Sequence, residues 1–170
     1  MKISLRRPLG LPAVVALLCT SVACTAATDG KASLAVPTPP ARQAELCRAL
    51  HKELPGTVDG RKRRSADPVS DLTAVWGDPA ISLRCGVGRP KILTPGTEHY
   101  NPTADSVEID GVEWLPEKQP DGSVRCTTTL RQAWVEVTLP KAVVGGAGDI
   151  SALTDLADAV GKTVPVGVQS

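Results

Sequence analysis

The sequence predicts an α+β fold, in which N- and C-terminal helices pack on one face of a mostly antiparallel sheet of about five strands. Three patterns lead to this prediction. Residues 40–54 and residues 149–164 each carry apolar side chains at the helical period. Between them, several short segments alternate apolar and polar side chains, as half-buried strands do. Strands grouped between two terminal helices are typical of a two-layer domain.

The first helix is predicted over residues 40–54, because Pro40 suits the first helical position and Pro55-Gly56 ends the pattern. Its apolar residues share one face: Leu46, Cys47, Leu50 and Leu54. The alternation in residues 80–87 predicts a strand with one apolar face: Ile81, Leu83, Cys85 and Val87. If the helix packs on that face, the sulfur atoms of Cys47 and Cys85 approach each other. We therefore expect a Cys47–Cys85 disulfide, which would close a loop of about 40 residues.

Two hairpins are expected in the second half of the chain. Asp110-Gly111 is a favoured two-residue type I′ turn, and it pairs Glu108 with Glu113 within residues 107–114. A second hairpin is predicted from residues 123–130 and 132–139. One strand would carry an apolar face made of Val124, Cys126, Thr128 and Leu130. The other would carry an apolar face made of Ala133, Val135, Val137 and Leu139.

The terminal helix follows a glycine-rich loop at residues 145–148. Asp149 is a plausible N-cap for this helix. The helix then has an apolar face at the helical period, made of Ile150, Leu153, Leu156, Ala157, Val160 and Val164.

The start of the chain has the layout of a bacterial lipoprotein signal. Basic residues precede an apolar run over residues 9–18, and small residues lead up to Cys24. We predict a signal peptide over residues 1–23 and lipidation of Cys24, which would anchor the protein to the outer face of the cell membrane. Plain secretion with cleavage near Ala23 or Ala26, and a retained leader, remain alternatives. Arg6-Arg7 fits a twin-arginine signal poorly.

The rest of the chain divides into three predicted parts. Residues 24–39 are small, polar and proline-rich, which predicts a flexible tether. Residues 40–165 form a single globular domain, and residues 166–170 form a tail. The whole chain has 19 basic and 18 acidic residues, and cleavage would remove three basic ones, leaving a net charge of −2. A near-neutral domain gives no electrostatic footprint for nucleic acid.

Two kinds of catalytic or metal chemistry are weakly indicated. Cys47, His51, Cys85 and Cys126 could form a Cys₃His zinc set, but an exported protein favours a disulfide plus one buried thiol, so we expect no metal or other cofactor. No nucleophile motif surrounds His51 or His99. Glu108 and Glu113 are weak catalytic candidates, because two close carboxylates can do acid–base work, although on an exposed hairpin they are more often solvated.

The candidate binding surface centres on Trp134, which should point away from the apolar face of its strand. An exposed Trp beside arginines is a common interaction anchor; the alternative is a Trp covered by a loop or helix. The candidate binding residues are Arg84, Arg125, Arg131, Trp134 and Glu136. The basic run Arg61-Lys62-Arg63-Arg64 is expected in a solvated loop, with contact to anionic lipids or wall polymers as the alternative.

Several stretches resemble an uncharacterised actinobacterial family catalogued as domain of unknown function 3515. They are Leu46–Leu50, Leu54-Pro55, Trp76–Ile81, Leu83–Val87, Val112–Trp114, Thr127–Arg131 and Val135–Pro140. The resemblance implies a small exported or membrane-tethered protein in which Cys47 pairs with Cys85. Cys126 stands where the family usually has an aromatic residue, and Trp134 where a Tyr is common.

The resemblance implies no activity, because the family has none established. We therefore expect an envelope lipoprotein of unknown activity, acting as a non-enzymatic binding or accessory module for an envelope protein or wall polymer. The alternative is an enzyme or accessory factor acting on cell-wall material. A third possibility is a purely structural role.

Overall fold

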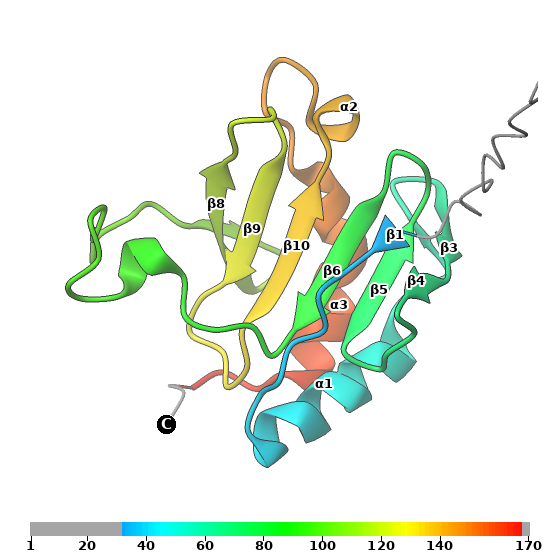
Figure 1. The fold of residues 1–170 in the computed structure, drawn as a ribbon, viewed down its shortest axis with the longest axis horizontal. Coiled ribbons are helices and arrows are strands. Elements are labelled where there is room, and N and C mark those ends of the chain that lie inside the picture. The colour runs from blue at the N-terminus through cyan, green and yellow to red at the C-terminus, as the bar shows by residue number, and fades with distance from the viewer. Residues whose placement is uncertain (1–31, 168–170) are drawn as a thin grey trace, which may run out of the picture.

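The structure, a computed structural model, describes residues 32–167. Its main feature is an eight-stranded sheet in the order β2-β3-β5-β6-β10-β9-β8-β7, in which every neighbouring pair is antiparallel (Figure 1). The α+β class and the mostly antiparallel sheet are confirmed, but the expected number of five strands is wrong. The eight strands are β2 Thr57–Val58, β3 Arg61–Arg64, β5 Thr73–Trp76, β6 Ile81–Cys85, β7 Val107–Ile109, β8 Val112–Lys118, β9 Val124–Thr128 and β10 Val135–Leu139.

The three strands missed by the sequence prediction are β2, β3 and β5. Strand β3 is the basic run Arg61–Arg64, which was expected in a loop. All four residues of β5 are buried, so its sequence does not alternate between apolar and polar side chains. Outside the main sheet, β1 (Ala32–Ser33) pairs in parallel with β4 (Ala66–Asp67).

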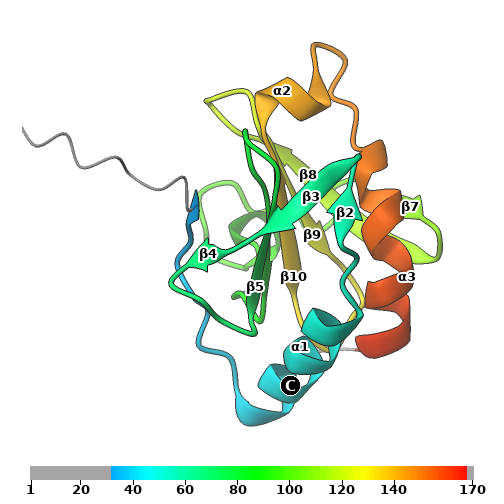
Figure 2. The same cartoon turned by 90° about the vertical axis from the view of Figure 1, so that its right-hand side faces the viewer.

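The helices lie on one face of the sheet. Helix α1 spans Ala41–Glu53, and α3 spans Thr154–Thr163 after a 3₁₀ turn at Ser151–Leu153. Asp149, the predicted N-cap of the terminal helix, accepts a 2.8 Å hydrogen bond from the Ser151 backbone N–H, but the N-cap of α3 is Leu153, because the 3₁₀ turn intervenes. Figure 2 shows α1 and α3 on the side of the sheet opposite to β1. A short helix, α2 (Lys141–Val144), and a second 3₁₀ turn (Lys91–Leu93) complete the elements.

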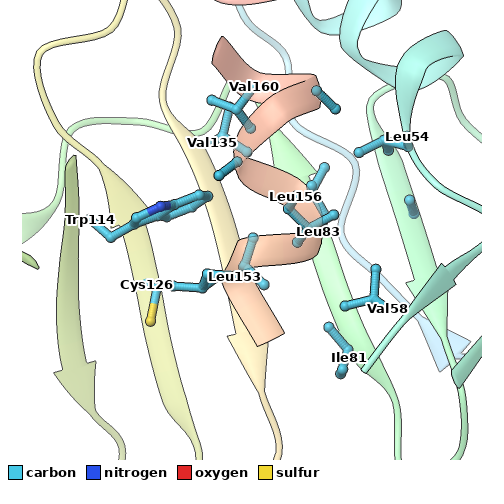
Figure 3. Packing of buried hydrophobic residues seen from close by; sticks show 14 of the residues in the cluster. Leu54, Val58, Ile81, Leu83, Trp114, Cys126, Val135, Leu153, Leu156 and Val160 are labelled. Carbon is cyan, nitrogen blue, oxygen red and sulfur yellow. The ribbon is translucent and has the colours of Figure 1, made fainter. Parts of the chain in front are cut away.

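The core lies between these helices and the sheet. Leu153, Leu156 and Val160 on the α3 side face Leu83 and Val135 of the sheet (Figure 3), and all five side chains are at most 2% exposed. Apolar burial of this kind contributes about 25 cal/mol per Å². The same core buries two tryptophans, Trp76 and Trp114. Because the chain has no Phe, these two rings supply most of the aromatic volume of the core.

The expected disulfide is confirmed. Cys47 on the buried face of α1 is bonded to Cys85 at the end of β6. Cys126 is a free, buried thiol in β9, and burial raises its pKa to about 12, with a further contribution from the nearby Glu117 carboxylate.

The disulfide removes Cys47 and Cys85 from any Cys₃His set. Residues 32–167 contain no cluster of His, Cys, Asp and Glu side chains suited to a metal ion.

The turn chemistry predicted the first hairpin correctly. Val107 pairs with Trp114, Glu108 with Glu113, and Ile109 with Val112. Asp110 and Gly111 both have positive φ, as a type I′ turn requires. The second hairpin is shorter than predicted. Strand β9 ends at Thr128 and β10 begins at Val135, so Leu130 lies in the connecting loop and is exposed rather than on an apolar strand face.

Residues 32–40 cross the face of the sheet opposite to the helices, and we call this segment the strap (Figures 1 and 2). The sequence predicts residues 24–39 as a flexible tether, but the described part, residues 32–39, packs on the domain. Its β1 pairs with β4, and the Leu34 N–H donates a 3.0 Å hydrogen bond to the Asp67 carbonyl. Proline-rich sequence shows no apolar period, yet the Pro39 ring approaches Gly86, the residue that follows β6.

The predicted signal peptide, Cys24 and the first part of the tether lie outside the described residues. The described part of the predicted tail, Val166 and Gly167, pairs with Arg131 and Leu130. No helix within residues 32–167 has the length and hydropathy needed to cross a membrane.

Candidate binding cleft

The outer face of the sheet, away from the helices, carries a row of charged side chains on four strands. Glu136 on β10 lies directly opposite Arg84 on β6, and Glu117 on β8 lies directly opposite Arg125 on β9. Side chains at alternate positions of a strand point to the same face, so these four meet on the outer face. Nε and Nη2 of Arg84 both lie 2.8 Å from Oε1 of Glu136. Nη2 of Arg125 lies 3.1 Å from Oε1 of Glu117.

Glu136 connects the two pairs. Its Oε2 is 4.0 Å from Nε of Arg125, and the residue is only 9% exposed. Such a carboxylate is stable only when its charge is matched. The row Arg84–Glu136–Arg125–Glu117 therefore balances two positive and two negative charges. This balance of charge allows four charged side chains to lie together on the outer face of the central strands.

Beside this row lies a cleft of about 960 Å³, which we call the Trp134 cleft. Its walls are the strap at Pro37–Pro40, the segment Gly86–Arg89 after β6, part of the loop before β7 and the residues 129–131. Trp134, which is half-buried, lines it together with Arg84, Arg89, Arg131 and Glu113. In Figure 1 the loop before β7 projects to the left of the sheet while the strap runs over β6. The cleft therefore lies on the outer face, between two irregular segments held by a rigid sheet.

Trp134 is positioned by the strand that follows it and by β6. Its carbonyl accepts a 2.8 Å hydrogen bond from the Gly86 N–H, which extends the β6–β10 ladder by one step. Gly86 has φ +85, and a side chain there would meet Pro39 of the strap, with the nearest carbon 2.5 Å away. Glycine at this position lets the strap approach the sheet closely.

Arg131 is the most buried arginine of the cleft, at 7% exposed. Its Nη1 donates to the Val164 carbonyl at 3.0 Å, and its Nη2 donates to the Gly111 carbonyl at 2.6 Å. These bonds join the end of α3 to the turn of the first hairpin. Arg131 therefore has a structural role in holding the cleft wall, in addition to lining the cleft.

The sequence-predicted binding residues divide between two sites. Trp134, Arg84 and Arg131 line the Trp134 cleft. Arg125 and Glu136 instead line a second cleft of about 520 Å³, next to strap residues 33–35, and Arg84 lines both. The expected Trp134–Arg125 surface is thus two neighbouring clefts that share Arg84, because the strap crosses the outer face.

The two glutamates proposed as a catalytic pair accept hydrogen bonds from different local donors. Their backbones pair as predicted, but the Glu108 carboxylate accepts from the Gly111 N–H, and the Glu113 carboxylate accepts from the Ser106 hydroxyl. Glu113 lines the Trp134 cleft and Glu108 does not. Each carboxylate therefore has its own local donor.

The basic run has a structural role in β3. The Arg63 guanidinium lies 5.8 Å from the centroid of the Trp76 ring and 2.8 Å from Nε2 of His51. Burial, together with the positive charge of Arg63, lowers the pKa of His51. Nε of Arg61 lies 3.4 Å from the Asp59 carboxylate and Nη1 of Arg64 lies 3.6 Å from the Asp78 carboxylate, so two of the four positive charges of this strand are paired. His99 is exposed in the loop before β7 and lines neither cleft.

Sequence reasoning missed Arg89 and the strap prolines. The one available signal was the segment Gly86-Val87-Gly88-Arg89-Pro90, whose two glycines after a strand allow close approach of another backbone. For the strap no signal exists, because its contacts with the sheet are set by tertiary structure.

Comparisons with curated proteins and with solved structures find no significant match to this chain. A family model does match residues 8–168, which is nearly the whole sequence, and its description is "Protein of unknown function (DUF3515)". The stretches that suggested the resemblance include Leu83–Val87, which supplies Arg84, the disulfide cysteine and Gly86, and Thr127–Arg131 beside the cleft. The chain therefore belongs to the DUF3515 family of proteins of unknown function.

Proposed function

We propose that this protein is a cell-envelope lipoprotein whose folded part is a non-enzymatic binding or accessory module. In this proposal residues 1–23 are the signal peptide, and lipidated Cys24 anchors the chain to the outer face of the cell membrane. The partner would be an envelope protein or a wall polymer. The leader sequence and the internal disulfide, which persists in oxidising compartments, both support an exported location.

The observation that supports binding is the Trp134 cleft. Its size, about 960 Å³, lies within the range of ligand sites, and its lining mixes apolar side chains with a few charged ones. Trp and Arg are the residue types that most often contribute strongly to binding. Two of its lining residues, Arg84 on β6 and Glu113 on β8, lie on paired strands, so the sheet holds one side of the cleft.

A binding assay on isolated cell-wall material tests this proposal. The purified protein should sediment with insoluble wall fragments, and Trp134→Ala should raise the dissociation constant by at least about tenfold, as expected for loss of a 1.4 kcal/mol contact. Tyr100→Ala is the matched control, because Tyr100 is an exposed aromatic residue that does not line the cleft. Equal sedimentation of both variants and the wild type would exclude the cleft as the binding site.

The anchor is tested separately. Mass spectrometry on protein from the native membrane fraction should find diacylglycerol on Cys24, and Cys24→Ala should release the protein from that fraction. An unmodified Cys24 in a membrane-free fraction would contradict the proposed anchoring and leave the cleft unaffected.

The alternative proposal is an enzyme or accessory factor that acts on wall material through Glu108 and Glu113. Only Glu113 supports it, because it lines the cleft beside Ser106. Glu113→Gln should then abolish turnover of wall fragments while leaving the sedimented fraction unchanged. A binding module predicts no turnover in either protein.

A further inference from the structure

We propose that the Trp134 cleft recognises a sugar-like ring that carries an oxyanion, either a carboxylate or a phosphate, with Trp134 as the stacking surface and Arg89 as the contact for the anion. This inference rests on the proposed binding function and adds a ligand class to it. Three observations support it: the charges that line the cleft, the position of its strands within the sheet, and the exposure of Trp134.

The charged residues that line the cleft are mostly basic. They are three arginines and one glutamate, and the carboxylate of that glutamate, Glu113, accepts from Ser106. Arg84 is balanced by Glu136 on the outer face. Arg89 differs, because it is exposed and forms no hydrogen bond or ion pair with the residues that the structure describes. It is the arginine that can turn its planar guanidinium to an incoming carboxylate or phosphate.

The sheet topology disfavours an extended peptide in this cleft. A peptide that binds by adding a strand needs an unpaired sheet edge. Strands β6 and β8, which supply Arg84 and Glu113 to the cleft, each have a partner on both sides, as does β10, which begins directly after Trp134. The edges of the main sheet are β2 and β7. Recognition in the cleft must therefore use side chains and the flanking segments. A compact ring suits that arrangement better than an extended chain does.

Trp134 provides the surface for such a ring. The face of an indole is electron-rich, and the C–H bonds on the flat face of a sugar carry partial positive charge, so the two attract when stacked. Trp134 is half-buried and lines the cleft, whereas the other two tryptophans, Trp76 and Trp114, are fully buried in the core. Only Trp134 can respond directly to a ligand in the cleft.

The three tryptophans make a direct test possible by NMR. In ¹⁵N-labelled protein, each indole N–H gives its own signal, and the signals of Trp76 and Trp114 serve as internal controls for unfolding. The probes are N-acetylglucosamine, N-acetylmuramic acid and N-acetylglucosamine 6-phosphate, which share a ring and differ in a neutral group, a carboxylate or a phosphate. A short acidic peptide is the fourth probe.

We expect the Trp134 signal to shift with both acidic sugars, at concentrations about fivefold lower than with the neutral sugar, which corresponds to one exposed ion pair of about 1 kcal/mol. Arg89→Gln should remove this fivefold preference and leave the affinity for the neutral sugar unchanged. Arg48→Gln is the matched control, because Arg48 is exposed on α1 and does not line the cleft. High salt should weaken the preference in the wild type. The relative affinities of the carboxylate and phosphate sugars identify which oxyanion the cleft prefers.

Three results would overturn the inference. Equal affinities for the three sugars would show binding at Trp134 without recognition of the oxyanion, and the proposed binding function would stand. A Trp134 shift with the acidic peptide alone would replace the ring by a peptide ligand. The absence of a Trp134 shift with every probe is the third result. If the wall-sedimentation assay also fails, the proposed binding function is contradicted too.

Discussion

Removing the Cys47–Cys85 disulfide should cost the protein a large share of its stability. The bond joins residues 38 positions apart in sequence. The loop-closure estimate for such a loop is about 4 kcal/mol, because the cross-link restricts the unfolded chain. Small domains have a total unfolding free energy of about 5–15 kcal/mol, so this loss is large. With a urea m-value of about 2 kcal/mol/M, loss of the cross-link alone should lower the midpoint of unfolding by about 2 M, and the two buried sulfurs lost in the Cys47→Ala/Cys85→Ala variant add to this fall.

The assay is urea unfolding followed by the fluorescence of the buried tryptophans. Cys126→Ala is the control, because it removes a fully buried sulfur without opening a loop, and should cost about 1 kcal/mol. The double variant removes two buried sulfurs, so its loss should exceed twice that of the control by about 4 kcal/mol. A loss no greater than twice the control would refute the reasoning, since it would mean that the cross-link contributes only packing. Wild type with its disulfide reduced should lose only the cross-link contribution of about 4 kcal/mol, because both buried sulfurs remain.

Three further predictions concern single residues. His51→Gln should flatten the pH dependence of stability below pH 6.5. The pKa of His51 is lowered in the folded state, so below this pH the unfolded state binds more protons than the folded state. The stability of the wild type therefore falls as the pH decreases. Urea midpoints at several pH values measure this, and equal slopes in both proteins would contradict it. Gly86→Ala should cost roughly 1–2 kcal/mol from positive φ alone, with an added clash against Pro39, and should expose the strap to limited proteolysis. An uncleaved, fully stable variant would argue against this close approach. Glu136→Gln should cost about 2 kcal/mol in urea unfolding, less than a fully buried pair because Arg84 is partly exposed, and an unchanged midpoint would show that the charge row contributes nothing.

The parts of the fold that were predictable from sequence depend on local chemistry. The first hairpin followed from Asp110-Gly111, whose turn type sets the register without help from the rest of the chain. The disulfide followed from two amphipathic patterns, because Cys47 and Cys85 each lie on an apolar face. In both cases each pattern lies in a short run of residues: the turn residues for the hairpin, and the apolar face around each cysteine for the disulfide.

The missed parts depend on distant contacts. Strand β3 is a run of four basic residues, and it is held by Arg63 lying over Trp76 and by Arg64 donating to the Gly77 carbonyl. No apolar alternation marks such a strand. The cleft was missed for the same reason: Arg89 and Pro39 come together only because the strap crosses the sheet, so Trp134 was recognised while its surroundings were not.

The position of the disulfide also has a mechanical consequence. If the chain is tethered through Cys24, any pull from the membrane enters the domain at the strap, whose two-residue strand β1 is its only ladder among the described residues. The strap and the first six residues of α1 can peel away in turn, but unravelling stops at Cys47, where the covalent bond passes the load to β6 in the middle of the sheet. Residues 32–46, fully extended, reach about 50 Å. The freed segment could thus lengthen up to that span, less the distance that it already covers in the fold, while the core stays folded.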